Sequence, residues 1–205
     1  MLAQHVVLRA GLLLTLVWST NACRARQQEP PPPEYTTTAT IKDLMVSIVD
    51  PSADVVWEAV ATLVTASGTE ERAPRTDEEW AKVRQGAIRL VEATNLLVVP
   101  GRRVARSHEK SEAPGVELEP EQMQQLIAKD IAGWRARANA LHEASLAALR
   151  AIDAKDAKAL NDTGERIDGA CENCHLQYWY PNQVLPPGYE ETAPRPRQSA
   201  APPKG

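Results

Sequence analysis

The chain has 205 residues, with 27 acidic and 23 basic side chains and a formal net charge of −4 at neutral pH. This acidic balance argues against nucleic acid as a partner, because phosphate backbones are bound by clustered lysine and arginine. Once the proline-rich ends are set aside, about 140 residues remain, which suits one domain and leaves no room for a second.

The first 22 residues predict an export signal that is removed from the mature protein. Arg9 precedes an apolar run from Gly11 to Trp18, and a short stretch of small and polar residues then leads to Ala22. The apolar run is too short to form a stable transmembrane helix. Cleavage after Ala22 would make Cys23 the first mature residue and would place the protein in the periplasm.

Proline-rich segments mark both ends of the predicted domain. Residues 23–40 contain four consecutive prolines and predict a tether with a stiff polyproline II section. Residues 181–205 carry further prolines and glycines without an apolar period, so they predict a disordered tail. The domain is therefore expected to span residues 41–180.

Within the domain, apolar residues recur at helical spacing throughout. A first helix is predicted from Ile41 to Gly68, and Pro51, which has no N–H group, should kink or restart it. Thr76 and Glu79 have the spacing of a capping box. They predict the start of a second helix, which stops before the following Pro-Gly pair.

Residues 102–119 are polar and long for a connection inside a compact domain, so we expect this segment to be functional or mobile. A third helix is predicted from Pro120 to Ile152, because Pro120 suits a first helical turn and the apolar period continues beyond it. A last helix should run from Ala154 to Tyr178. Four helices without strands predict an all-α, antiparallel four-helix bundle.

The last helix carries the spacing C-x-x-C-H, formed by Cys171, Cys174 and His175. This spacing is typical of the attachment site of a covalently bound c-type haem. Residues three and four apart share one face of a helix, so the two thiols and the imidazole can all reach one flat macrocycle. We therefore predict one haem c, bound through Cys171 and Cys174 with His175 as an iron ligand.

Two other uses of this motif are less well supported. A redox-active C-x-x-C pair normally opens a helix that follows a strand, and no strand is predicted before Cys171. A structural zinc site needs about four ligands. The remaining candidates, Cys23 and the other three histidines, are not at ligand spacing.

Cys23 has two open interpretations. Acylation at this position, as in bacterial lipoproteins, would anchor the protein to a membrane, although Thr20 and Asn21 depart from the usual lipobox. The alternative is an unmodified thiol or an intermolecular disulfide. Exported proteins seldom keep a free thiol, and two of the three cysteines are assigned to haem, which favours lipid on Cys23.

A bundle whose last helix carries C-x-x-C-H resembles the class II c-type cytochromes, the cytochrome c prime family and its low-spin relatives. The resemblance covers residues 40–181, and its specific parts are the haem motif, the following Tyr178-Trp179-Tyr180-Pro181 run, and the opening segment from Ile41 to Met45. It implies a haem inside the bundle, with His175 as the proximal ligand and the first helix over the opposite haem face. In low-spin relatives a methionine on that helix binds iron, which implies Met45 here.

Other residues remain candidates around such a haem. Read without the family, Met45 fits equally well as a core residue on the apolar stripe. Met123 and His142 are weaker candidates for the sixth iron ligand, and if neither they nor Met45 binds, the iron stays five-coordinate. Trp57, Trp80 and Trp134 could pack on the haem, although core packing is the ordinary role of each.

Three functions follow from these alternatives. We expect a periplasmic carrier of single electrons, with His175 and Met45 on the iron and redox proteins as partners. A five-coordinate iron would instead suit binding of nitric oxide or carbon monoxide. An enzyme such as a peroxidase would need a positioned distal acid-base group, and none is evident near Met45. Monomer and homodimer both stay open.

Overall fold

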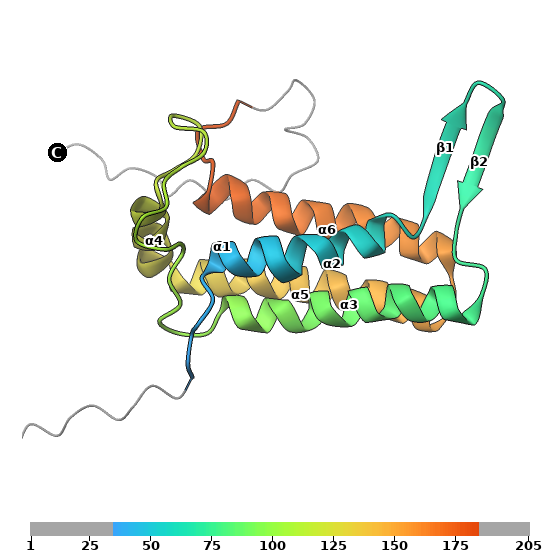
Figure 1. Ribbon diagram of the computed structural model, residues 1–205, viewed down its shortest axis with the longest axis horizontal. Coiled ribbons are helices and arrows are strands. Elements are labelled where there is room, and N and C mark those ends of the chain that lie inside the picture. Colours follow the sequence, from blue (N-terminus) through green and yellow to red (C-terminus); the bar gives the residue numbers. More distant parts are fainter. Residues whose placement is uncertain (1–34, 185–205) are drawn as a thin grey trace, which may run out of the picture. The chain divides into compact units, whose positions relative to one another are not determined.

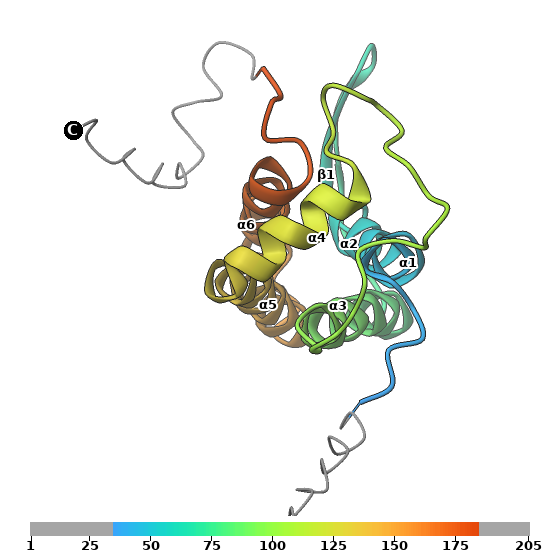
Figure 2. The ribbon, with the colours of Figure 1, turned by 90° about the vertical axis from the view of Figure 1, so that its left-hand side faces the viewer.

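The computed structural model describes residues 35–184, and the predictions for the signal peptide, Cys23, most of the tether and most of the tail lie outside this range. Within it the chain forms the predicted four-helix bundle (Figures 1 and 2). Its four parts are the segment α1, η1 and α2 (Ile41–Leu44, Met45–Val49 and Asp50–Trp57), α3 (Asp77–Leu97), α5 (Ile131–Asp153) and α6 (Ala157–Tyr178). No helix in the described range is both long and apolar enough to cross a membrane.

The first helical segment changes from α-helix to π-helix close to Pro51, where the sequence predicts a kink. Thr40 and Asp43 form a capping box that starts α1, a pairing that the sequence analysis did not include. The next five residues, Met45–Val49, form one turn of π-helix, and Pro51 follows in the first turn of α2. A wider turn suits this site, because Pro51 cannot donate the hydrogen bond of a continuous α-helix.

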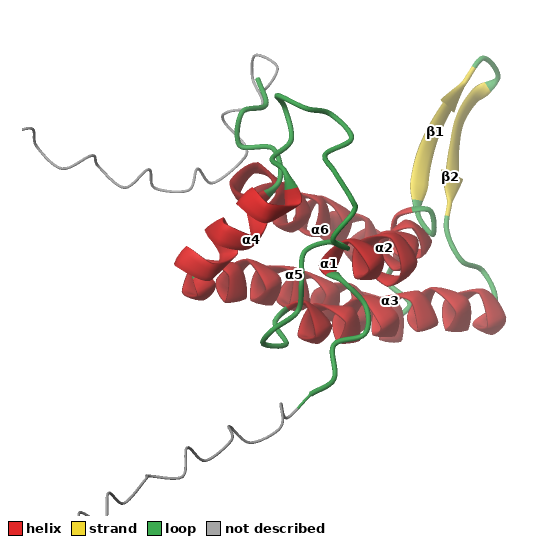
Figure 3. Cartoon of the chain, turned by 60° about the vertical axis from the view of Figure 1, so that its left-hand side comes forward, coloured by secondary structure: helices red, strands yellow, loops and turns green. Residues whose placement is uncertain are grey.

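The predicted continuation of this helix to Gly68 is wrong. The helix ends at Trp57, and the chain instead forms an antiparallel hairpin from β1 (Ala61–Thr65) and β2 (Gly68–Arg72), which Figure 3 shows at one end of the bundle. Gly68 has a φ of 131°, which side-chain-bearing residues rarely adopt. The β-branched residues of this stretch favour a strand, and their spacing also continued the helical stripe, which misled the prediction.

The third predicted helix is in fact two. It breaks at Asp130, so α4 (Pro120–Lys129) crosses one end of the bundle and α5 starts afresh (Figure 2). The Asp130 carboxylate caps α5 by accepting a hydrogen bond from the Gly133 N–H at 2.9 Å. The apolar period runs across the break, which is why it predicted one helix.

The core is divided into a larger cluster in the body of the bundle and a smaller one under α4. The larger cluster is tightly packed, and Ala87, Leu90 and Ala148 are fully buried in it. Small residues let the helices approach closely: a methyl group on Gly86 of α3 would lie 2.5 Å from a Val55 methyl of α2. The smaller cluster consists of Ile41, Leu44, Leu97, Val104, Ala105, Ile127, Trp134, Ala138 and Tyr178.

Candidate haem site

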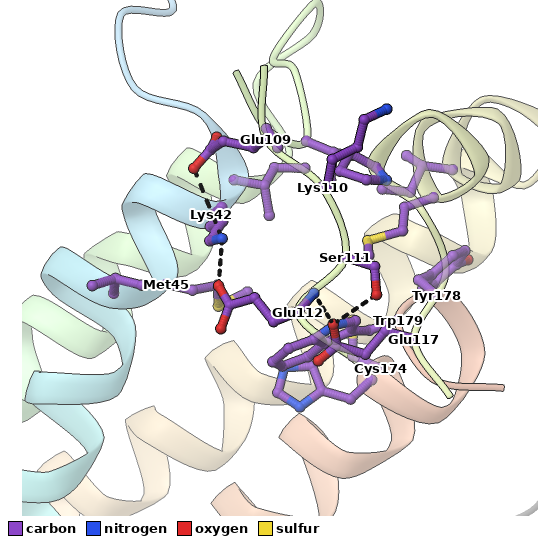
Figure 4. A pocket seen from close by; sticks show the side chains of 18 of the residues that line it. Lys42, Met45, Glu109, Lys110, Ser111, Glu112, Glu117, Cys174, Tyr178 and Trp179 are labelled. Atoms are coloured by element: carbon purple, nitrogen blue, oxygen red, sulfur yellow. Dashed lines mark hydrogen bonds and ion pairs between the residues drawn. The ribbon is translucent and has the colours of Figure 1, made fainter. Parts of the chain in front are cut away.

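Two adjoining cavities lie at the end of the bundle that α4 crosses. The first has a volume of about 240 Å³ and is bounded by α1, η1, the 102–119 segment, α4 and the end of α6 (Figure 4). The second, of about 180 Å³, extends between the helices of the bundle. The residues that line both cavities are Met45, Asp50, Trp134, Cys174 and His175.

The predicted attachment residues lie together on α6 and face these cavities. Cys174 and His175 line both cavities, and Cys171 lines the second. The two thiols are not joined in a disulfide. The helix therefore presents both sulfur atoms and the imidazole toward the same enclosed space, as the C-x-x-C-H spacing predicts.

Burial determines the protonation of these three groups. It raises the pKa of the Cys171 thiol to about 12, and the nearby Cys174 and Asp50 add to this effect. Burial likewise raises the pKa of Cys174 to about 12, against the opposing charge of Arg137. Burial lowers the pKa of His175, although the Glu172 charge opposes it. At neutral pH the site thus holds two thiols, which are poor nucleophiles, and a neutral imidazole, the form that binds a metal.

Met45, the second iron ligand that the family resemblance implies, lines both cavities and is half-buried. It is the first residue of the π-helical turn, and Figure 4 shows its side chain extending into the first cavity. Its thioether sulfur and the His175 imidazole therefore belong to the same lining. This arrangement brings together the two side chains that the family resemblance pairs, although it does not by itself make Met45 a ligand.

The other candidates that the sequence suggested are distributed differently. Met123 lines the first cavity only. His142 lies outside both linings, and its Nδ1 is 2.8 Å from the Thr94 hydroxyl oxygen, so it acts as a hydrogen-bonded polar group in the bundle. Among the tryptophans, Trp134 lines both cavities and Trp57 the second, whereas Trp80 is buried in the larger core cluster.

Aromatic side chains pack the cavity wall below α4. The Trp134 and Tyr178 rings meet edge to face with centroids 5.3 Å apart. Trp134 donates its indole N–H to the Leu97 carbonyl at 3.0 Å, and Tyr178 donates its hydroxyl hydrogen to the Asp130 carboxylate at 3.0 Å. The Arg137 guanidinium lies over the Tyr178 ring, 5.4 Å from its centroid. These contacts give a wall whose polar atoms are paired, as buried polar groups require.

The 102–119 segment forms part of the lining of the first cavity. Its start pairs with α1, since the Ile41 N–H donates to the Arg103 carbonyl at 2.9 Å and Lys42 Nζ lies 2.7 Å from Glu112 Oε1. Its end pairs with the end of α6, where the Leu118 N–H donates to the Trp179 carbonyl at 2.8 Å. The segment is thus tied to both sides of the cavity, which explains the length of this connection.

A second group of residues surrounds His175, and the sequence analysis assigned them no role. The Trp179 ring meets the His175 ring edge to face, with centroids 4.9 Å apart. The Tyr180 hydroxyl oxygen lies 3.3 Å from His175 Nδ1 and donates its hydrogen to Glu172 Oε2 at 2.6 Å. The proline that follows Tyr180 signals a helix end, which is the sequence feature that could have pointed to a chain reversal onto His175.

Other chemistries find less support in the described residues. No group of three or more histidine, cysteine, aspartate and glutamate side chains is placed to hold a metal ion in residues 35–184. A zinc or other protein-only metal site therefore lacks its ligands there. A c-type haem, by contrast, needs two thiols, one imidazole and apolar walls, all of which line the cavities. The residues present fit this group.

Comparisons with known proteins give one likeness. No protein family and no curated protein sequence matches the chain. A solved structure titled cytochrome c′ is similar to it, with 20% sequence identity, a TM-score of 0.41, and coverage of 69% of this chain and 98% of that chain. A likeness at this level does not assign a family, so the function has to be argued from the site itself.

Proposed function

We propose that this protein is a c-type cytochrome that carries single electrons. Cys171 and Cys174 would hold one haem covalently, and His175 and Met45 would bind its iron. The observation that carries the proposal is that all four side chains line the same pair of adjoining cavities. When bound, the haem would supply a reversible one-electron couple.

Each protein group has a defined task in this proposal. The Cys171 and Cys174 thiols would hold the haem through two thioether links, an addition that needs no oxidant. The thioether links retain the cofactor in a small bundle. The apolar walls exclude water and lower the local dielectric, and they tune the potential together with the axial ligands. A Met and His pair favours a raised potential and a six-coordinate iron, as suits a carrier.

The same proposal extends to location and partners. An exported cytochrome would act in the periplasm, held to a membrane only if Cys23 is acylated, and would exchange electrons with other redox proteins. It would have no enzymatic activity of its own. The export signal and the haem motif in the sequence support the proposed location and the redox partners.

The second candidate is a gas-binding cytochrome with an open iron site. It would follow if Met45 acts only as a wall residue, as its position on the apolar stripe of the first helix allows. Ferrous iron with an open site binds carbon monoxide at once, whereas a bound methionine must first leave. The rate of carbon monoxide binding therefore separates the two candidates.

The test uses the full chain made in a host with haem-attachment machinery. We expect a coloured protein that keeps its porphyrin mass after denaturation, and Cys171→Ser with Cys174→Ser should lose that mass. Spectra should be low-spin in both oxidation states and become high-spin in Met45→Ala, whereas Met123→Ala, the matched control, should leave them unchanged. A colourless product would refute the haem. High-spin spectra in the wild-type protein that stay unchanged in Met45→Ala would favour the gas-binding candidate.

A further inference from the structure

The end of α6 folds back onto the imidazole of the haem motif. The His175 carbonyl accepts hydrogen bonds from the Trp179 N–H at 2.8 Å and from the Tyr180 N–H at 3.0 Å. Pro181 then prevents the helix from continuing. This double acceptance turns the chain so that Tyr180, five residues after His175, lies beside the His175 ring, with ring centroids 5.6 Å apart.

The turn is held in place from both directions along the chain. The Leu118 N–H, from the 102–119 segment, donates to the Trp179 carbonyl at 2.8 Å, and the Gln183 N–H donates to the Tyr180 carbonyl at 3.0 Å. The Trp179 ring packs against the Tyr180 ring, with centroids 5.3 Å apart and 45° between the ring planes. Tyr180 is therefore fixed by main-chain bonds as well as by its side chain.

The hydrogen bonds of the Tyr180 hydroxyl have only one consistent direction. A carboxylate accepts hydrogen bonds and donates none, so the 2.6 Å contact with Glu172 Oε2 uses the single hydroxyl hydrogen of Tyr180. The hydroxyl oxygen is then left as an acceptor toward His175 Nδ1, 3.3 Å away. The tautomer of His175 that completes this contact carries its hydrogen on Nδ1, and it leaves the lone pair of Nε2 for a metal.

We propose that Tyr180 and Glu172 form a relay that positions His175 and strengthens its donation to the haem iron. The inference rests on the proposed haem function and adds two residues to that site. A ligand imidazole usually donates its second N–H to a carboxylate, carbonyl or water, which fixes the ring and raises its basicity. Here a tyrosine stands between the imidazole and the carboxylate, so Tyr180 and Glu172 are positioning residues and do not touch the iron.

The distances from Tyr180 to Glu172 and to His175 indicate how strong each link of the relay is. The link from Tyr180 to Glu172 is short and charge-assisted, so it holds the hydroxyl firmly. The link from His175 to Tyr180 lies beyond the usual 2.7–3.2 Å range, so it orients the ring and fixes its tautomer more than it polarises it. Greater electron donation by the imidazole stabilises ferric iron. Removal of the relay should therefore raise the reduction potential modestly and loosen the His175 ring.

The test compares reduction potentials of the haem-loaded protein, Tyr180→Phe, Glu172→Gln and the double variant. Tyr180→Phe should raise the potential. Glu172→Gln should raise it both through the lost charge beside His175 and through the relay, so the double variant should shift the potential by less than the sum of the two single shifts. In parallel, the Nδ1 proton of His175, observed by its paramagnetically shifted NMR signal, should exchange with water faster in Tyr180→Phe. Glu165→Gln is the matched control, since it removes the charge of an exposed carboxylate on the same helix that lines neither cavity.

The outcomes separate the relay from the function on which it depends. An unchanged potential and unchanged proton exchange in haem-loaded Tyr180→Phe would overturn the relay and leave the cytochrome in place. Additive shifts from the two single variants would also overturn it, because Glu172 would then act as a separate charge. A wild-type protein that binds no haem would instead refute the proposed function.

Discussion

The body of this bundle and the end that α4 crosses have the same helical spacing in sequence but are packed differently. In the body, Leu90, Ala148 and Ile167 are fully buried in a continuous cluster of apolar side chains. At the end crossed by α4, Met45 and Met123 are only half-buried, and they line cavities together with the thiols and the imidazole. Protein interiors hold few voids larger than a water molecule. The difference therefore separates a close-packed part, which provides stability, from a part that encloses cavities.

The largest expected effect tests this division directly. Leu90→Ala should lower the free energy of unfolding by about 2–5 kcal/mol, because Leu90 is fully buried and its neighbours cannot close the gap completely. Met123→Ala, at the cavity, should cost about 1 kcal/mol in the haem-free double serine variant of Cys171 and Cys174. Chemical denaturation followed by far-UV circular dichroism measures both values. Equal losses of unfolding free energy in Leu90→Ala and Met123→Ala would contradict the difference in packing between the two regions.

Substitutions of glycine should have the next largest effect on stability, with opposite signs on α3 and α6. Gly86→Ala should destabilise the protein by about 1–3 kcal/mol, because the new methyl would overlap Val55 where α2 and α3 meet. Gly169→Ala is the matched control on α6, where an added methyl meets no heavy atom within 4 Å. It should stabilise the protein by about 0.5–1 kcal/mol through helix propensity. Thermal unfolding of both variants decides the sign, and stabilisation by Gly86→Ala would show that the two helices can move apart.

The same contrast explains which features could be predicted from sequence. The bundle was predictable, because an apolar stripe marks the buried face of a helix regardless of which helix packs against it. The Thr76 capping box is likewise a local signal in the sequence. The hairpin and the break at Asp130 were not. Their residues also satisfy the helical period, and the choice depends on Gly68 and on a side-chain cap that periodicity does not detect.

The candidate site was predictable only along one helix. Cys171, Cys174 and His175 form a local pattern, so their common face follows from helix geometry. Met45 came from a family resemblance, since it is far from the motif in sequence. The contacts of Tyr180 with Glu172 and His175 depend on how the chain reverses after α6, and the place of residues 102–119 in the cavity lining depends on contacts with α1. Spacing alone contains neither piece of information.

Capping residues at the two ends should differ by a smaller amount. Thr40, before α1, is buried, and its hydroxyl both accepts from the Asp43 N–H at 3.0 Å and donates to the Asp43 carboxylate at 2.9 Å. Thr76, before α3, makes the equivalent cap in an exposed setting. Thr40→Ala should cost about 1–2 kcal/mol and Thr76→Ala about 0.5–1 kcal/mol in denaturant unfolding.

The Thr40 cap also bears on the site, because α1 has only four residues before the π-helical turn that carries Met45. Thr40→Ala should loosen Met45 and speed carbon monoxide binding to the ferrous haem-loaded protein. Thr76→Ala, which is far from the cavities in sequence and caps a different helix, should leave that rate unchanged. Equal rates in the two variants would show that Met45 is held independently of the start of α1.

The smallest expected effect is on the loss of stability at acidic pH. The Arg75 and Thr76 N–H groups donate to Glu79 and hold its pKa below the ordinary value. The folded protein therefore binds this proton less readily than the unfolded chain. The resulting stability is present above the unfolded pKa and is lost as the pH falls through the lowered folded pKa. Glu79→Gln should flatten that acid limb when unfolding is measured across pH 3 to 7.

Asp43 offers the matching measurement at the cavity end. Its pKa is lowered by hydrogen bonds from the Thr40 N–H and hydroxyl and by the charge of Arg106, whose Nη2 lies 2.7 Å from Asp43 Oδ1. Asp43→Asn should also flatten the acid limb, and because an exposed ion pair contributes here, the wild-type limb should become shallower in high salt. Glu79 accepts mainly backbone hydrogen bonds, so its contribution should depend less on salt. An equal salt response of Asp43→Asn and Glu79→Gln would show that the Arg106 pair does not act at the cavity end.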